Sequence, residues 1–270
     1  MQRVNLDGVD LEYDVQGSGE PVLLIHGSIL ADAFFPLLAE PRLTSNYRVI
    51  MYHRRGFAGS ARAPSPFSMG QQAADGRALL RHLGLPRVHV AGHSYGAAIA
   101  VQWALDAPEE VRSVALLEPP LMEWIPSGPA YWEWVASVRE RYERGEKAEV
   151  TDTFLTGVAG PAYRQVLDKV LPPGWFALAV ADIDTFFQVE LPELQRWCFT
   201  VEDAQRLRAP VLAVVGSETA PIFSEGHALL KQWMPQAEEL VVPHVTHALQ
   251  LMNPSTVADG LARFFARHML

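Results

Sequence analysis

Short apolar runs alternate with longer helical patterns along most of this chain, and this alternation constrains the fold more than any other feature. Seven runs rich in Val, Ile and Leu predict buried strands: Val9–Val15, Val22–His26, Arg48–Tyr52, Val88–Ala91, Ser113–Leu117, Val211–Val215 and Glu239–Val242. Four longer patterns predict helices: Met69–Leu83, Tyr95–Asp106, Ser224–Trp233 and Ser255–Ala266. Strands that are apolar on both faces and joined by helices are typical of a mostly parallel sheet. The sequence therefore predicts an α/β fold.

The stretch from Pro119 to Thr200 departs from this alternation and reads as helical. It holds half of the chain's 26 aromatic residues, namely Trp124, Tyr131, Trp132, Trp134, Tyr142, Phe154, Tyr163, Trp175, Phe176, Phe186, Phe187, Trp197 and Phe199. We predict a core formed by residues 1–118 and 201–270, with residues 119–200 inserted as a helical cap.

An insertion that leaves the carboxyl end of a strand lies over the crevice where open α/β sheets bind ligands. We therefore expect at least three aromatic side chains of the cap to line a substrate pocket, while the others pack into a small helical core. The candidates for substrate binding are Trp124, Trp132, Phe186 and Phe187.

Composition argues against several classes of protein. The formal net charge is −9 and Lys and Arg form no cluster, so we expect no nucleic-acid partner. Cys198 is the only cysteine, which excludes an internal disulfide and suits a reducing cytoplasm. The start of the chain has no signal-peptide pattern and no long apolar span occurs, so we expect a cytoplasmic protein that does not bind a membrane. No dinucleotide motif or metal-ligand pattern is evident, and we expect neither a cofactor nor a metal.

The most specific motif is Gly92-His93-Ser94-Tyr95-Gly96, which stands between a predicted strand and a predicted helix. A nucleophile that projects into a cleft needs a sharp strand-to-helix turn, and the two glycines permit the close backbone approach of such a turn. The motif therefore predicts that Ser94 is a nucleophile. A serine that only caps the helix after a glycine turn is the alternative.

With this motif in place, nearly the whole chain resembles the α/β-hydrolase family. The resemblance lies in the elbow and in three further segments: Leu24-Ile25-His26-Gly27-Ser28, Arg54-Arg55-Gly56-Phe57-Ala58-Gly59-Ser60 and Thr246-His247-Ala248. It implies an α/β-hydrolase fold with a helical cap inserted after the sixth strand. Epoxide hydrolases and haloalkane dehalogenases share this outline but carry Asp where this chain has Ser94. The resemblance thus favours hydrolysis of an ester, thioester, lactone or carbon–carbon bond.

A serine nucleophile also needs a base and an oxyanion site. An imidazole with a pKa of ~6.5 suits the base, and His247 follows the last predicted strand, where the family places its base. His244 is the nearest rival. The backbone N–H of Tyr95, at the start of a helix, provides one oxyanion donor. The resemblance places the second donor on the backbone N–H of Ser28.

The acid that orients the base has two candidates, because Thr219 stands where the family usually keeps a carboxylate. Glu118 ends the strand that follows the elbow helix, so it is expected one strand spacing, ~4.8 Å, from the strand of Ser94. Pro119 predicts an extended conformation for Glu118. Glu218 lies one residue before the expected position, and one step along a strand reverses the side chain. We favour Glu118, with Glu218 as the alternative; a carboxylate that only braces the cap is a third reading.

The sequence thus predicts a cofactor-independent serine hydrolase that acts on a small hydrophobic ester, lactone or thioester through an acyl-enzyme on Ser94. One alternative is a carbon–carbon bond hydrolase, a lyase or a cofactor-free oxygenase on the same triad. Another is a small-molecule receptor on a hydrolase scaffold. His26 is expected to hold its loop, and His93 to pack beneath the elbow. Arg54 and Arg55 are expected to brace their turn through salt bridges rather than to grip a phosphate or carboxylate.

Overall fold

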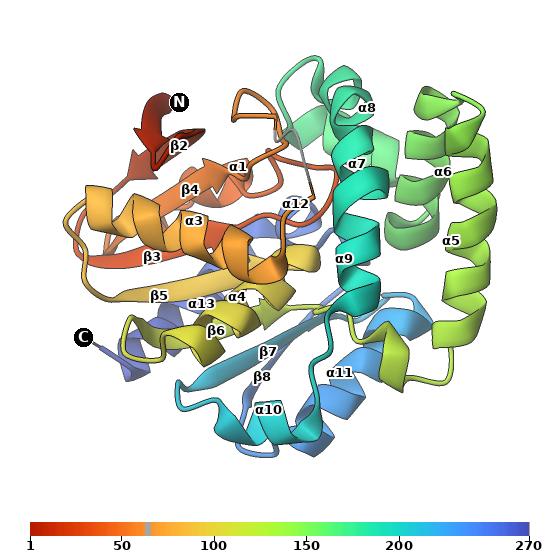
Figure 1. Ribbon diagram of the computed structural model, residues 1–270. Helices are drawn as coiled ribbons and strands as arrows, with labels where there is room; N and C mark the ends of the chain where they lie inside the picture. Colours follow the sequence, from red (N-terminus) through yellow and green to blue (C-terminus); the bar gives the residue numbers. More distant parts are fainter. Residues whose placement is uncertain (63–65, 270) are drawn as a thin grey trace.

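The computed structural model describes residues 1–62 and 66–269, and within them eight strands form one sheet with helices on both faces (Figure 1). The strands are β1 (Gln2–Leu6), β2 (Val9–Gln16), β3 (Glu20–Ile25), β4 (Tyr47–His53), β5 (Val88–His93), β6 (Val111–Leu117), β7 (Val211–Gly216) and β8 (Glu238–Val242). Their order is β1-β2-β4-β3-β5-β6-β7-β8. The neighbours from β4 to β8 pair in parallel, whereas β2 pairs antiparallel with β1 and β4. The predicted α/β class is confirmed.

Strand β1 was not predicted from the sequence. This edge strand forms a hairpin with β2 through Asp7 and Gly8, both with positive φ. Its side chains are exposed or half-buried, so the strand has no continuous apolar run to reveal it. The Asp-Gly pair is a hairpin signal in its own right, and it is the feature that could have indicated the strand.

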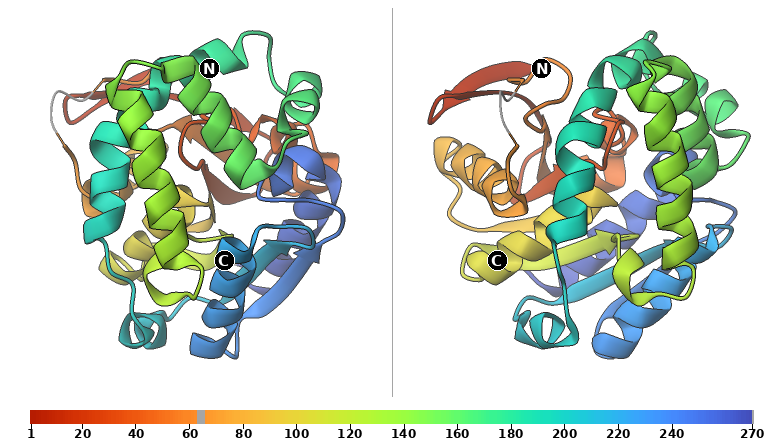
Figure 2. Two further views of the ribbon diagram at one scale, coloured as in Figure 1. Left: turned by 90° about the vertical axis from the view of Figure 1, so that its right-hand side faces the viewer. Right: turned by 45° about the vertical axis from the view of Figure 1, so that its right-hand side comes forward.

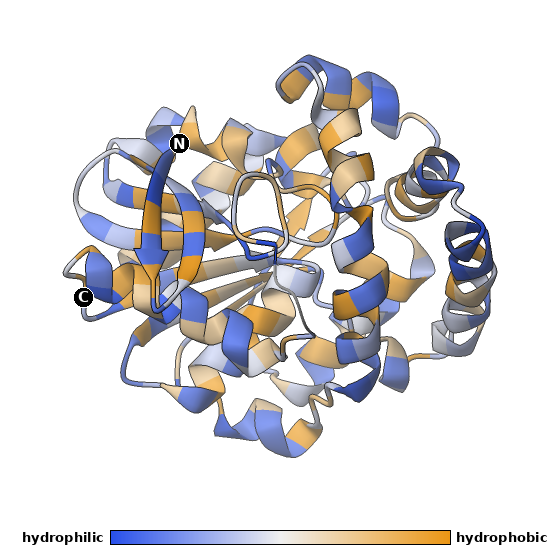
Figure 3. Ribbon diagram, turned by 45° about the horizontal axis from the view of Figure 1, so that its top comes forward, coloured by the Kyte–Doolittle hydropathy of each residue, from blue (hydrophilic) through white to orange (hydrophobic). Residues whose placement is uncertain are grey.

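Alternate side chains of the parallel strands serve two separate cores. On one face, Leu23 and Ile25 of β3 share a cluster with α3 (Met69–His82), α4 (Tyr95–Asp106) and α11 (Pro221–Trp233). On the other face, Leu24 packs in a cluster with α1 (Phe35–Leu38), α2 (Pro41–Thr44), α12 (Leu249–Met252) and α13 (Pro254–Arg267). Figure 3 shows the apolar strands between helices whose outer faces are hydrophilic. Burial on both sides explains why these strands read as unbroken apolar runs.

The chain between β6 and β7 is helical, as the sequence predicts for this stretch. It forms η1 (Met122–Trp124), α5 (Gly128–Glu143), α6 (Lys147–Ala159), α7 (Tyr163–Val170), α8 (Trp175–Thr185), the π-helix η2 (Phe186–Glu190), α9 (Leu191–Arg196) and α10 (Val201–Arg206). Helices α5 to α9 lie together beyond the carboxyl ends of the parallel strands (Figures 1 and 2). The boundaries of a separate cap at residues 119 and 200 stay a prediction.

None of the helices in the described residues can cross a membrane alone, judged by length and apolar content. One bent pair, Tyr163–Val170 with Trp175–Arg196, meets that test jointly.

Candidate active site

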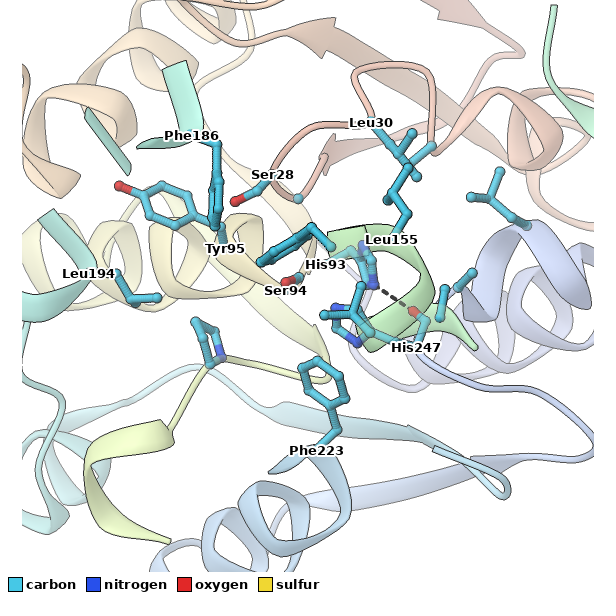
Figure 4. Close-up of a pocket in the computed structure, with 18 of the residues that line it drawn as sticks. Ser28, Leu30, His93, Ser94, Tyr95, Leu155, Phe186, Leu194, Phe223 and His247 are labelled. Carbon is cyan, nitrogen blue, oxygen red and sulfur yellow. Dashed lines mark hydrogen bonds between the residues drawn. The ribbon is translucent and has the colours of Figure 1, made fainter. Parts of the chain in front are cut away.

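Ser94 sits at the sharp turn between β5 and α4. Its backbone has φ 53° and ψ −122°, a conformation that non-glycine residues rarely adopt. The glycines on either side admit no side chain. A Cβ on Gly92 would lie 2.2 Å from the carbonyl oxygen of Gly96, and a Cβ on Gly96 would lie 2.2 Å from that of Ile25. The turn therefore depends on both glycines, and Ser94 lines the cavity above it (Figure 4).

Glu118 emerges beside Ser94 because β6 is the neighbour of β5. Leu117 pairs with His93, and the Ser94 N–H donates to the Leu117 carbonyl at 2.8 Å. The Glu118 side chain is fully buried, and its Oε2 accepts a 2.5 Å hydrogen bond from Nδ1 of His247. The structure thus brings the favoured acid and the favoured base into direct contact.

Two further donors hold the Glu118 carboxylate. The N–H of Gly216 donates to Oε1 at 2.8 Å, and the hydroxyl of Thr219 donates to Oε2 at 3.1 Å. Both donors come from β7 and the turn that follows it, where the family usually keeps its acid. Thr219 thus stands at the usual position and binds a carboxylate that arrives from the next strand.

The backbone of Glu118 differs from the expectation. Its φ is 48°, so the extended conformation predicted from Pro119 is wrong. The Glu118 N–H still bonds to Val214 of β7 at 3.1 Å, and the positive φ follows immediately where the chain leaves the sheet. The three hydrogen bonds on its carboxylate compensate for this unfavourable backbone conformation.

The rival residues lie apart from the cavity. Glu218 and His244 lie within hydrogen-bond distance of each other, with Nδ1 of His244 3.2 Å from Oε1 of Glu218. Their side chains are 58% and 89% exposed, respectively. Neither residue lines the cavity that contains Ser94.

Two aromatic rings fix the imidazole of His247. Phe223 of α11 stacks on it with ring centroids 3.6 Å apart and an angle of 5° between the planes. His93 lies 4.6 Å away and donates from Nε2 to the backbone carbonyl of His247 at 2.8 Å. Neither contact was predicted from the sequence. For Phe223, the rotation of α11 about its own axis decides which residue meets the imidazole. Within the described residues, the side chains of Ser94 and His247 face one cavity without a direct hydrogen bond.

Burial dominates the electrostatics of this group. It raises the pKa of the Glu118 carboxyl to about 7, although the Gly216 and Thr219 donors act in the opposite direction. Burial lowers the pKa of His247 to about 3. It also lowers the pKa of His93 to about 3, with a further contribution from the neighbouring His247. His247 is therefore neutral at physiological pH, which is the state that a general base requires.

The predicted oxyanion donors lie on either side of the elbow. Ser28 and Tyr95 both line the cavity (Figure 4). The loop of Ser28 approaches the elbow closely, because a Cβ on Gly27 would lie 3.1 Å from the Cβ of Ser94. In the described part of the chain, the backbone N–H groups of Ser28 and Tyr95 donate to no other residue. Both groups are therefore available to a ligand in the cavity.

The cavity itself is predominantly apolar, and the centre of a water-sized molecule can move through about 60 Å³ of it. Its wall includes three aromatic residues of the insertion, Tyr131, Phe154 and Phe186, as well as Leu155 and Val158. The expectation that at least three insertion aromatics line the pocket is thus met. The described lining residues include no Asp, Glu, Lys or Arg.

Only Phe186 of the four named candidates for substrate binding lines this cavity. Trp124 is 47% exposed and packs edge-on against Trp233. Trp132 lies in a small neighbouring hollow, and Phe187 stacks on Tyr142 at 4.4 Å. Consecutive residues on a helix point about 100° apart, so aromatic content alone does not identify the cavity-facing member of a pair.

Comparison with known proteins identifies the family that has this fold. The family model for the alpha/beta hydrolase fold matches residues 20–156. The chain belongs to the α/β-hydrolase family. A relative from Azorhizobium caulinodans, whose name assigns it provisionally as the carbamate hydrolase RutD, is 27% identical, with 94% of each chain covered. A non-heme haloperoxidase from Rhodococcus erythropolis is 25% identical over 96% of each chain.

The solved structure of a thermophilic esterase from Thermogutta terrifontis has the same fold. It superposes with a TM-score of 0.76 at 23% identity, and both chains are covered completely. Together the family model and the relatives support hydrolase activity for this chain.

The raised pKa of Glu118 predicts how the reactivity of Ser94 depends on pH. A protonated carboxyl group cannot accept the Nδ1 hydrogen of His247, so the site loses its base as the pH falls through about 7. The rate constant for labelling Ser94 with a fluorophosphonate should reach a plateau at alkaline pH and be half-maximal near pH 7. A labelling rate that is half-maximal at about pH 4.3, the ordinary pKa of a Glu side chain, would contradict this assignment.

Proposed function

We propose that this protein is a cofactor-independent serine hydrolase that cleaves small, uncharged, apolar esters through an acyl-enzyme on Ser94. The observation that carries the proposal is the buried 2.5 Å bond between Glu118 and His247 at a cavity that Ser94 also lines. Lactones and thioesters present the same electrophilic carbonyl group and belong to the same proposal.

In the proposed mechanism, Ser94 Oγ attacks the carbonyl carbon while Nε2 of His247 takes the hydroxyl proton. Glu118 accepts the Nδ1 hydrogen and stabilises the imidazolium that forms. The backbone N–H groups of Ser28 and Tyr95 bind the oxygen on which negative charge develops. His247 then returns the proton to the leaving alcohol, and a water molecule activated in the same way releases the acid.

The wall of the cavity supports an uncharged substrate. An ionised group that enters it would lose its water without gaining a charged partner among the described lining residues, and this exchange is strongly unfavourable. The aromatic rings of Tyr131, Phe154 and Phe186 suit an apolar acyl or alkyl group in the same space.

A fluorophosphonate probe and a series of p-nitrophenyl esters test this function. We expect labelling that Ser94→Ala abolishes, and hydrolysis of neutral acyl esters from acetate upward. As a matched pair, we compare p-nitrophenyl hexanoate with the p-nitrophenyl monoester of adipic acid. The two acyl chains have the same length, and the second carries a terminal carboxylate. The neutral ester should be favoured by ~10²-fold or more in kcat/KM, because the carboxylate would be buried without a partner.

Each other outcome of that experiment has a definite meaning. Labelling of Ser94 without turnover of any ester would overturn ester hydrolysis and favour another reaction on the same residues, such as carbon–carbon bond cleavage. The absence of labelling at Ser94 would overturn the nucleophile and favour a small-molecule receptor.

Replacement of either glutamate distinguishes the two candidate acids. Glu118→Gln should lower kcat by ~10²- to 10⁴-fold, because an amide cannot stabilise the imidazolium. Glu218→Gln alters only an exposed contact with His244 and should leave kcat within about twofold of wild type. Steady-state kinetics on one ester, with a thermal melt of each variant, measures this difference. The reverse ranking would assign the acid to Glu218.

A further inference from the structure

A buried ion pair joins the helical insertion to the turn after β4. Nη1 of Arg54 lies 2.5 Å from Oε1 of Glu190, the last residue of η2, and the two side chains are 1% and 0% exposed. Arg54 and Arg55 both form ion pairs, as the sequence predicts for their turn. A charged pair this deeply buried is costly unless further hydrogen bonds satisfy its remaining polar atoms. Oε2 of Glu190 has no hydrogen-bond partner among the described residues, so the compensating bonds are those of Arg54, and they indicate what the pair holds in place.

The remaining donors of Arg54 bind the loop that carries the proposed oxyanion donor. Nε donates to the carbonyl of His26 at 3.0 Å, and Nη2 donates to the carbonyl of Gly27 at 2.8 Å. The backbone N–H of Arg54 donates to Nε2 of His26 at 3.0 Å, so Nδ1 of His26 carries the hydrogen and donates to the Gly27 carbonyl at 2.7 Å. The Gly27 carbonyl thus has two donors.

The geometry of the peptide bond transmits this constraint to Ser28. The Gly27 carbonyl and the Ser28 N–H belong to one planar trans peptide group and point in opposite directions. When Arg54 and His26 hold the carbonyl, they also fix the direction of the Ser28 N–H. The next residue, Ile29, is buried with φ 69°, which is unusual for a β-branched side chain and indicates a loop held by external contacts.

Arg54 also reaches the side chain of Tyr95, the residue whose backbone N–H is the second proposed oxyanion donor. Nη1 donates to Oε1 of Gln72 at 2.6 Å, and Nε2 of Gln72 donates to the Tyr95 hydroxyl at 3.0 Å. The guanidinium carbon lies 5.2 Å from the centre of the Tyr95 ring. One buried cation therefore supports both residues whose backbone N–H groups would bind the oxyanion.

We propose that Arg54 is a positioning residue for the oxyanion hole, and that Glu190 of the insertion holds Arg54 in its working position. Docking of the insertion then sets the catalytic geometry as well as the shape of the pocket. Phe186 and Glu190 share the π-helix η2, so one turn of the insertion contacts both the cavity and Arg54. This inference rests on the proposed function, because it assumes that the Ser28 and Tyr95 amides bind a developing oxyanion.

The chain offers a matched control for the docking of the insertion. Asp182 of α8 is buried and also connects the insertion to the β4 turn, where it accepts from the Ala58 N–H at 2.9 Å and from Arg62 at 2.5 Å. Among the described residues, Ala58 and Arg62 form no hydrogen bond with Arg54, with the loop of Ser28 or with Tyr95. Glu190→Gln and Asp182→Asn therefore make the same chemical change at two buried contacts of the insertion, and only the first contact reaches Arg54.

The test compares kcat, KM and the fluorophosphonate labelling rate of these two variants with wild type. Glu190→Gln should lower kcat and the labelling rate by about 10- to 100-fold with little change in KM, since the hole acts on the charged transition state. Asp182→Asn should lower the melting temperature and keep kcat within about threefold of wild type, because it leaves the oxyanion donors in place.

Equal effects of the two variants on kcat, or a change confined to KM, would overturn the inference. If Glu190→Gln does not fold, Arg54→Lys provides the second variant, because one ammonium group cannot reproduce the fork of donors on two carbonyls and Gln72. Its matched control is Arg55→Lys at the neighbouring Arg55–Asp75 pair. A wild-type protein that is not labelled at Ser94 would instead overturn the proposed function itself.

Discussion

The site depends on the hydrogen bonds that the buried carboxylate of Glu118 accepts. The carboxylate takes hydrogen bonds from Gly216 at the end of β7, from Thr219 in the following turn and from His247 after β8. A buried carboxylate is tolerated only with such donors, and loss of one would leave a polar group without a partner. The carboxylate thus ties the loop of His247 to the middle of the sheet and fixes the orientation of the imidazole beside the cavity that Ser94 also lines.

A second buried charge supports the opposite side of the nucleophile. Arg54 binds the loop carbonyls next to Ser28, and in our proposal it fixes the oxyanion donors as Glu118 fixes the base. The two groups differ in origin. Glu118 is held entirely by the sheet and its loops, whereas Arg54 is paired with Glu190 of the insertion. The insertion also reaches the loop of the base, because the Thr246 hydroxyl donates to the Ala159 carbonyl of α6 at 2.7 Å. On this proposal, the pairing of Glu190 with Arg54 makes the oxyanion hole depend on the insertion as well.

The sequence predicts those parts of the site that follow from strand adjacency. The elbow at Ser94 was recognisable because two glycines stand between a buried strand and a helix, and Glu118 because its strand follows the elbow helix. The positive φ of Glu118 could not be predicted from the sequence, because a proline biases the conformation of the preceding residue without deciding it. Contacts that depend on helix rotation, such as Phe223 on His247 or Phe187 on Tyr142, leave no signal in local sequence. The edge strand β1 was not predicted because its side chains are exposed or half-buried, so its sequence contains no continuous apolar run.

The most direct measurement of the central claim is a crystal structure of the protein after reaction with a fluorophosphonate. The account predicts a covalent bond from phosphorus to Ser94 Oγ, with the phosphoryl oxygen within hydrogen-bond distance of the Ser28 and Tyr95 N–H groups. Nε2 of His247 should face the adduct while Nδ1 remains bonded to Glu118. An adduct whose phosphoryl oxygen points away from both amides, or an imidazole bonded to another carboxylate, would contradict it.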